Sequence, residues 1–127
     1  MAKSLRGSTK TGRILLADDE EMVRKAIRMI LAFGGYQIVE AADGEEAVQK
    51  YLEASPAFDL ILIDLDMPRL GGVEAMARIR RYDPLAKAIF LSGGVHAGAL
   101  EKTIFLQKPF DNKELIGLVR ETLEAEA

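Results

Sequence analysis

The stretch LILIDLDMP, from Leu60 to Pro68, decides the fold of this chain. Its run of large aliphatic residues, which ends at Ile63, is typical of a strand that is buried on both faces. Two carboxylates, Asp64 and Asp66, follow this run, and the stretch contains no cation. It therefore predicts a buried strand whose carboxyl end carries negative charge that another group must compensate.

Strand-like and helix-like segments alternate on both sides of this stretch. Apolar runs predict five strands, at Arg13–Ala17, Tyr36–Ala41, Phe58–Asp64, Lys87–Ser92 and Thr103–Lys108. Helical spacing and end signals predict helices at Glu20–Phe33, from Asp43 to Ser55, from Gly71 to Asp83, and after a capping box made by Asp111 and Glu114. This alternation predicts an α/β fold, a doubly wound five-stranded parallel sheet with helices on both faces. We expect the second strand at an edge, because Gln37 and Glu40 interrupt its apolar pattern.

Composition narrows the class of protein. The 127 residues suffice for one domain, which we expect at residues 13–125, after a flexible tail or linker at residues 1–12. The absence of cysteine excludes disulfides and thiolate metal sites. A net charge of -3 gives no reason to expect direct nucleic-acid binding, and no apolar run approaches the roughly 20 residues that span a bilayer. We therefore expect a cytoplasmic protein that does not bind membranes.

Polar side chains collect at the predicted carboxyl ends of the strands. Asp18 and Asp19 follow the first strand, Asp64 ends the third, Ser92 ends the fourth and Lys108 follows the fifth. Ligands of open parallel sheets bind at these strand ends. Three carboxylates against one lysine suit a hard divalent cation, Mg²⁺ or Mn²⁺. The sequence therefore predicts a metal site at this edge of the sheet.

Four blocks of sequence resemble those of a response-regulator receiver domain, the phosphate-accepting module of two-component signalling. The blocks are LLADDE (Leu15–Glu20), LILIDLDMPRLGG (Leu60–Gly72), IFLSGG (Ile89–Gly94) and FLQKPF (Phe105–Phe110). The resemblance extends from about Arg13 to Leu123. It implies a flavodoxin-like strand order of 2-1-3-4-5.

The resemblance also implies an acceptor and its metal ligands. Asp64 would accept a phosphoryl group from a histidine kinase or a histidine phosphotransfer domain. Asp19 would be the main metal carboxylate, with Asp18 assisting, and Asp64 would share the ion. The backbone carbonyl of Asp66 would complete the protein ligands, while the Asp66 side chain either contributes or faces solvent. Mg²⁺ would be the ordinary cofactor, with Mn²⁺ as a substitute.

Further roles follow from the same resemblance. Ser92 would donate its hydroxyl to a phosphoryl oxygen, and Lys108 would pair with Asp64 and then with the phosphate. A cis peptide bond to Pro109 would hold Lys108 in place. Phe105 would move inward when Ser92 is drawn to the phosphate, so Ser92 and Phe105 would form the switch. The protein would not be an enzyme beyond self-phosphorylation from a phosphodonor and slow autodephosphorylation.

One segment departs from the usual pattern of the family. Only ten residues, Gly93–Lys102, separate the fourth and fifth predicted strands, and a crossover needs about 10–12 residues with its helix. We therefore expect a short or irregular fourth helix, of the kind found in receivers appended to hybrid sensor kinases. The usual receiver dimer face would then be altered, which leaves the oligomeric state open. A free-standing single-domain receiver remains an equal alternative.

Two other classes of function can be drawn from these residues. An Asp-x-Asp motif after an apolar strand also occurs in haloacid-dehalogenase-like phosphatases. In those enzymes, however, the nucleophile precedes the acidic metal pair, whereas here the pair comes first. The second alternative is a binding module with the receiver fold that takes no phosphate. The presence of the acceptor, the lysine and the acidic pair argues against it.

Overall fold

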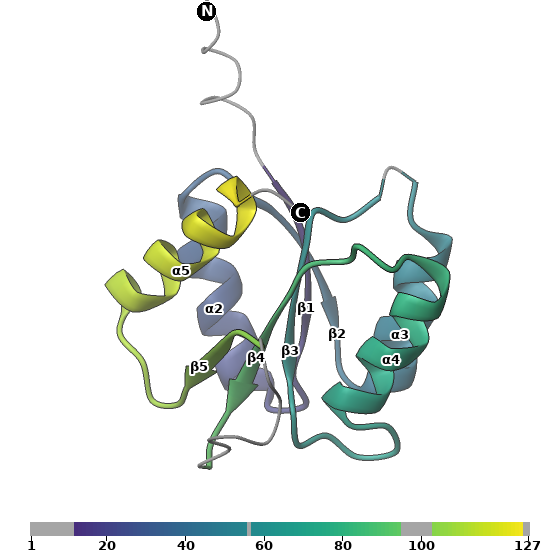
Figure 1. Cartoon of the computed structure of the whole chain (residues 1–127). Helices are drawn as coiled ribbons and strands as arrows, with labels where there is room; N and C mark the ends of the chain where they lie inside the picture. The colour runs from purple at the N-terminus through teal and green to yellow at the C-terminus, as the bar shows by residue number, and fades with distance from the viewer. Residues whose placement is uncertain (1–11, 56, 95–102, 126–127) are drawn as a thin grey trace, which may run out of the picture.

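A single parallel sheet forms the centre of the computed structural model, which describes residues 12–55, 57–94 and 103–125 (Figure 1). Its strand order is β2-β1-β3-β4-β5, as the resemblance implied. The strands are β1 (Arg13–Ala17), β2 (Gln37–Ala41), β3 (Leu60–Asp64), β4 (Ala88–Ser92) and β5 (Phe105–Gln107). The prediction that the second strand lies at an edge is confirmed.

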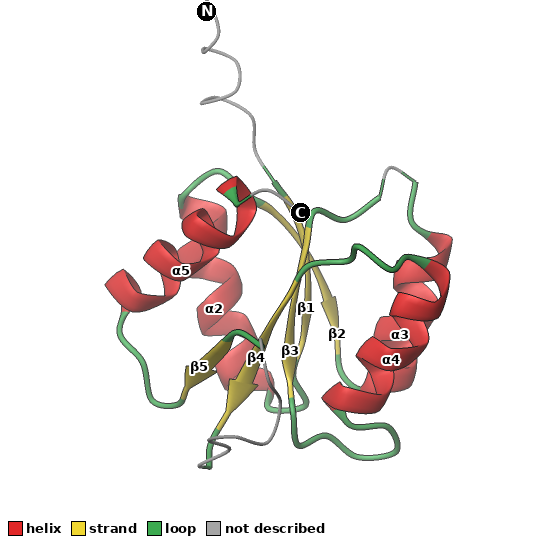
Figure 2. Cartoon of the chain, in the orientation of Figure 1, coloured by secondary structure: helices red, strands yellow, loops and turns green. Residues whose placement is uncertain are grey.

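Four helices cover the two faces of this sheet within the described ranges. They are α2 (Glu21–Phe33), α3 (Gly44–Glu53), α4 (Gly72–Tyr82) and α5 (Asn112–Glu124). Helices α2 and α5 lie on one face and α3 and α4 on the other, so the predicted doubly wound architecture is confirmed (Figure 2). None of these helices is long and apolar enough to cross a membrane. The predicted short helix falls in residues 95–102 and most of the predicted tail in residues 1–11, both outside the described residues.

The first strand has the predicted bounds, and the other four strands are shorter than their apolar runs. The fifth strand was predicted over six residues, but β5 spans only Phe105–Gln107 because β4 offers it three paired positions. At the start of the third run, Asp59 lies outside β3, although its N–H donates to the Arg13 carbonyl at 2.7 Å and its carboxylate accepts from the Arg13 N–H at 2.8 Å. Apolar pattern therefore extends beyond the residues that the neighbouring strand can pair.

Alternate residues of each central strand enter two separate cores. Ile14 and Leu16 of β1 face α2 and α5, while Leu15 and Ala17 face α3 and α4. All four are fully buried, as is the run from Ile61 to Ile63. Each large side chain buried in this way stabilises the fold by about 1.5–3 kcal/mol before entropy is counted. The two-sided burial explains the continuous apolar runs of the sequence.

The starts of α3 and α5 are fixed by capping side chains. The Asp43 carboxylate accepts a hydrogen bond from the Glu46 N–H at 2.8 Å and begins α3. At α5 the predicted capping box is confirmed: Asp111 accepts from the Glu114 N–H at 2.8 Å, and the Glu114 carboxylate accepts from the Asp111 N–H at 3.1 Å. These caps fix where each connection leaves the sheet.

Candidate functional site

The carboxyl ends of β1, β3 and β5 bring three charged side chains together. Asp18 follows β1 and Asp64 ends β3, and the register pairs Ala17 with Ile63, so the two carboxylates lie on neighbouring strands. One carboxylate oxygen from each of Asp18, Glu20 and Asp64 lies within 4.8 Å of the others. The predicted cluster of charge at this edge is therefore present.

Lys108 provides the cation that lies among these carboxylates. Its Nζ lies 2.9 Å from Asp18 Oδ2, 3.1 Å from Glu20 Oε1 and 3.3 Å from Asp64 Oδ2. The Lys108 N–H donates to the Ser92 carbonyl at 2.7 Å, and the peptide bond to Pro109 is cis, as the resemblance implied. Burial by itself would lower the pKa of Lys108, but the surrounding carboxylates raise it overall. The ammonium therefore remains protonated.

Asp64 is buried in a position that disfavours its charge. Its side chain is 5% exposed, and its Oδ1 accepts a hydrogen bond from the Asp66 N–H at 3.2 Å. Burial raises the pKa of Asp64, and the negative charge of Asp18 raises it further, although the Asp66 N–H and Lys108 oppose both. Lys108 therefore compensates the charge of Asp64 only in part, because it is shared with Asp18 and Glu20.

Like the buried Asp64 carboxylate, the Asp18 carboxylate is placed so that it could bind a cation. Its side chain is 0% exposed, and its Oδ1 accepts from the Glu20 N–H at 2.9 Å. Its Oδ2 is buried and accepts no hydrogen bond, and the Lys108 ammonium meets it as an ion pair. Three carboxylates share one ammonium, and all their donor atoms are hard oxygens. The residues present therefore fit a divalent cation such as Mg²⁺.

Glu20 is a member of the cluster that sequence reasoning did not select. It stands at the N-cap of α2, directly after the acidic pair, and that position was the available signal. The side chains of Asp19 and Asp66 are exposed, and neither belongs to the group of close carboxylate oxygens. The metal-binding roles of Asp19 and of the Asp66 carbonyl stay predictions.

Ser92 and Phe105, the residues of the predicted switch, lie on the neighbouring strands β4 and β5. Ser92 ends β4, is 2% exposed, and donates its hydroxyl to the Gly94 carbonyl at 2.9 Å. The same hydroxyl accepts from the Gly94 N–H at 3.1 Å. The half-buried ring of Phe105 lies 5.9 Å from that of Phe90, centroid to centroid. In this state the Ser92 hydroxyl is fully occupied by its own loop.

Gly72 packs closely against the backbone of Asp64, the phosphoacceptor candidate. It is the first residue of α4, and its N–H donates to the Leu65 carbonyl at 3.1 Å. A Cβ at this position would lie 2.5 Å from the Asp64 carbonyl oxygen. Glycine therefore allows the helix to begin directly against the Asp64 backbone.

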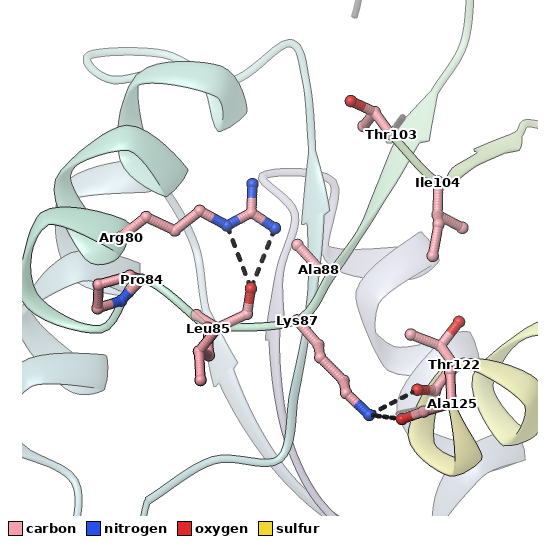
Figure 3. A pocket seen from close by; sticks show the side chains of 10 residues that line it. Arg80, Pro84, Leu85, Lys87, Ala88, Thr103, Ile104, Thr122 and Ala125 are labelled. Carbon is pink, nitrogen blue, oxygen red and sulfur yellow. Dashed lines mark hydrogen bonds between the residues drawn. The ribbon is translucent and has the colours of Figure 1, made fainter. Parts of the chain in front are cut away.

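A hollow of about 440 Å³ lies at the opposite end of the sheet (Figure 3). Its two cations are already engaged by backbone carbonyls. Arg80 donates twice to the Ala86 carbonyl at 3.1 and 3.0 Å, and Lys87 donates to the Thr122 and Ala125 carbonyls at the end of α5 at 3.0 and 2.6 Å. The Lys87 contacts cap the end of α5. Because both cations of the hollow are engaged, the carboxylate cluster is the stronger candidate site.

Comparisons with known proteins identify related chains over nearly the whole domain. The family model for the response regulator receiver domain matches residues 14–120. The chemotaxis protein CheY of Bacillus subtilis is 35% identical over 121 residues, which cover 87% of this chain and 97% of that protein. A chain in the CheX–CheY–BeF₃–Mg²⁺ complex from Borrelia burgdorferi is 29% identical with a TM-score of 0.82, covering 90% of each chain. The receiver domain of the hybrid histidine kinase CckA is 36% identical with a TM-score of 0.76, covering 89% of this chain and 100% of that domain.

Proposed function

This chain belongs to the response regulator receiver domain family, and we propose that Asp64 is its phosphoacceptor. The observation that carries the proposal is the buried Asp64 carboxylate, which lies 3.3 Å from the Lys108 ammonium at the carboxyl end of β3. As a receiver domain, the protein acts as a phosphorylation switch in two-component signalling and is not an enzyme in the ordinary sense. Its activity is to take up one phosphoryl group and later lose it to water.

Mg²⁺, or Mn²⁺ in its place, is the cofactor that we propose for this step. The related chain from Borrelia burgdorferi comes from a complex with BeF₃ and Mg²⁺, and the buried Asp18 Oδ2, whose ion pair with Lys108 is shared with two other carboxylates, supports the same ion here. Asp18, Glu20 and Asp64 are the side chains that would hold it, with Asp19 as the further carboxylate that the sequence predicts. The ion would neutralise charge on the transferring phosphoryl oxygens.

The phosphoryl transfer itself needs a nucleophile and two donors from this chain. An Asp64 carboxylate oxygen attacks the phosphorus of a phosphohistidine, the P–N bond breaks, and the imidazole leaves with that electron pair. Lys108 then pairs with a phosphoryl oxygen. Ser92 leaves Gly94 and donates its hydroxyl to another oxygen, and Phe105 moves into the space that this shift opens. The resulting acyl phosphate is hydrolysed by water, which restores Asp64.

An apolar stripe on α2 supports a protein phosphodonor, either a histidine kinase or a histidine phosphotransfer domain. Met22, Ala26, Met29 and Phe33 repeat at helical spacing and are exposed, with Met22 at 86% and Phe33 at 96%. The stripe begins two residues after Glu20, at the rim of the site. A helix of the donor that lies on this stripe would bring its histidine toward Asp64. We propose no direct role for nucleic acid or membranes, and a cytoplasmic location.

The setting of the domain is a further part of the proposal. The similarity to the CckA receiver supports a receiver appended to a hybrid sensor kinase, whereas the near-complete coverage of the Bacillus subtilis CheY supports a free-standing one. Sedimentation with and without beryllofluoride tests whether the activated domain dimerises. Unchanged monomeric sedimentation on activation is expected for an altered dimer face.

The function is tested by incubating the protein with acetyl phosphate or phosphoramidate and Mg²⁺, followed by mass spectrometry. We expect the mass of one phosphoryl group, sensitive to hydroxylamine, and none after chelation of the metal. Asp64→Asn should abolish the modification, whereas the matched control Glu74→Gln changes an exposed carboxylate on α4 and should retain it. Persistence of the same modification in Asp64→Asn would refute the assignment. If the folded wild type takes up no phosphate from any donor, the chain is instead a receiver-fold binding module.

A further inference from the structure

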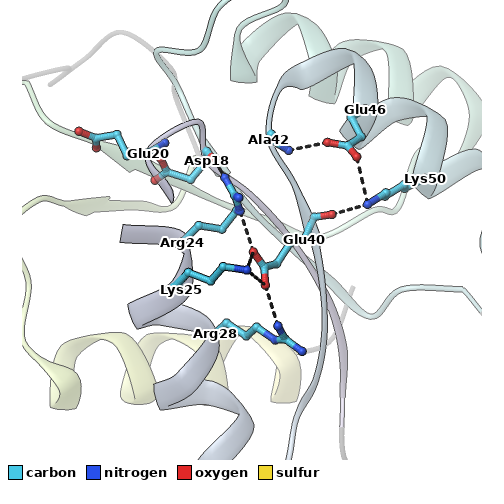
Figure 4. Close-up of polar contacts among 9 residues, drawn as sticks. All are labelled: Asp18, Glu20, Arg24, Lys25, Arg28, Glu40, Ala42, Glu46 and Lys50. Atoms are coloured by element: carbon cyan, nitrogen blue, oxygen red, sulfur yellow. Dashed lines mark hydrogen bonds and ion pairs between the residues drawn. The ribbon is translucent and has the colours of Figure 1, made fainter. Parts of the chain in front are cut away.

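Arg24 connects the metal-site edge of the sheet to the outer strand β2 (Figure 4). It lies in the first turn of α2, and its side chain is only 13% exposed. Its Nη1 donates to the Asp18 carbonyl at 2.7 Å, and its Nε donates to Glu40 Oε1 at 2.7 Å. One guanidinium therefore joins the backbone of Asp18 to the carboxylate of Glu40, which lies sixteen residues after Arg24 in the chain.

Glu40 is itself held firmly in place. Its side chain is 16% exposed and also pairs with Lys25 at 3.4 Å and Arg28 at 3.0 Å. Its carbonyl accepts a hydrogen bond from Lys50 at 2.6 Å. Besides Arg24, two cations of α2 and one lysine of α3 thus hold Glu40 in place. Because the single Glu40 carboxylate is shared by three cations, a variant that keeps the charge of Arg24 is needed to separate the effect of geometry from that of charge.

The contacts of Asp18 show what this anchor achieves. The Asp18 N–H donates to the Ala41 carbonyl at 3.1 Å, and the Asp18 carbonyl accepts from Arg24. Its Oδ1 accepts from the Glu20 N–H, which leaves Oδ2 as the atom directed at Lys108. The backbone of Asp18 is therefore held on both sides from β2, once directly and once through Arg24.

We propose that Arg24 is a positioning residue that orients Asp18 for metal binding by fixing its backbone carbonyl against Glu40. The inference rests on the proposed function, since it concerns the same metal site. Without Arg24, the Asp18 carbonyl loses its donor and the peptide that follows can rotate. Because that peptide carries the segment to Glu20, the carboxylates of Asp18 and Glu20 then no longer converge with Asp64.

The planar guanidinium is the feature that makes this role specific to arginine. Nε and Nη1 donate in two fixed directions from one rigid group, and here one direction meets Asp18 and the other Glu40. A lysine ammonium could reach the two partners only from one nitrogen at the end of a flexible chain, so it would not fix the angle between them. Arg24→Lys should therefore retain the charge and still impair the site.

The test measures Mg²⁺ affinity by calorimetry on protein that urea unfolding shows to be folded under the same conditions. Substitution of a residue that orients a metal ligand typically weakens metal binding by about 10–100-fold. We therefore expect the Kd for Mg²⁺ to rise by at least about 10-fold in Arg24→Met and in Arg24→Lys. Arg28→Met is the matched control, because Arg28 also pairs with Glu40 but has no contact with Asp18 among the described residues. Its Kd for Mg²⁺ should stay within about twofold of wild type.

A double-variant comparison separates positioning from general stability. In an Asp18→Asn background the Asp18 carboxylate is already lost, so adding Arg24→Met should raise the Mg²⁺ Kd by a smaller factor than it does in the wild-type background. Wild-type affinity in Arg24→Met, or an equal loss in Arg28→Met, would overturn the inference while leaving the proposed function intact. Failure of the folded wild type to bind Mg²⁺ and to take up phosphate would remove both together.

Discussion

Gly72→Ala is expected to destabilise the fold and to slow phosphorylation at the same time. The added Cβ would lie 2.5 Å from the Asp64 carbonyl oxygen, about 0.9 Å short of the 3.4 Å at which ordinary van der Waals contact begins. The obstructing atoms belong to the backbone, so helix α4 or β3 must move. Overpacking of this kind costs about 1–3 kcal/mol, of which roughly 0.5–1 kcal/mol is offset by the better helix propensity of alanine. We therefore expect a net loss of about 1–2 kcal/mol and a thermal midpoint roughly 3–10 °C lower.

The functional part follows from the same displacement. A shift of about 1 Å at a reacting group can lower a rate by about 100-fold, so phosphorylation by acetyl phosphate should slow by roughly 10–100-fold in folded protein. Gly117→Ala is the matched control, because no atom lies within 4 Å of its added Cβ in α5. It should stabilise the protein by about 0.5–1 kcal/mol and leave the rate unchanged. Wild-type stability and rate in Gly72→Ala would refute the argument from close approach.

Three further predictions concern a cap, a buried carboxylate and the exposed stripe. Asp111→Ala removes the capping box of α5 and should cost about 1 kcal/mol in urea unfolding; an unchanged midpoint would contradict the role of the cap. Burial by itself would raise the pKa of Glu40, but Arg24 and Lys25 lower it overall, so its contribution to stability is present above its unfolded pKa and is lost as the pH falls through the folded one. Glu40→Gln should therefore give a flatter stability curve than wild type below about pH 4.5, and parallel curves would count against this pairing. Phe33→Glu should slow phosphotransfer from a histidine phosphotransfer domain but not from acetyl phosphate, whereas equal slowing with both donors would argue against docking on α2.

The fold could be predicted because the hydrophobic patterns that specify its strands and helices are local and recur along the chain. The run ending at Ile63 reflects burial on both faces, and the interrupted pattern around Gln37 and Glu40 reflects the edge position of β2. The limits of the strands were less predictable, because they depend on pairing. Thr103 and Ile104 are as apolar or β-branched as their neighbours, yet they lie outside β5.

The site residues likewise fall into those that the sequence predicts and those that it does not. Asp18, Asp64 and Lys108 could be selected because each stands at the end of a predicted strand, and parallel strands bring such ends together. Glu20 enters the cluster through the direction of the α2 N-cap, which periodicity does not specify. Arg24 could not be selected at all, since its partner Glu40 lies on another strand and only the packing of α2 beside β2 brings them within 2.7 Å.

The two hydrogen bonds between Ser92 and Gly94 set a resting bias for the proposed switch. Each such bond contributes about 0.5–1.5 kcal/mol net, so breaking both costs about 1–3 kcal/mol. An equilibrium with that free-energy gap leaves roughly 1–15% of unphosphorylated molecules with a released hydroxyl at any moment. A residue at position 94 that disturbs this loop would therefore raise the fraction of unphosphorylated molecules in which the Ser92 hydroxyl is ready to meet a phosphoryl oxygen.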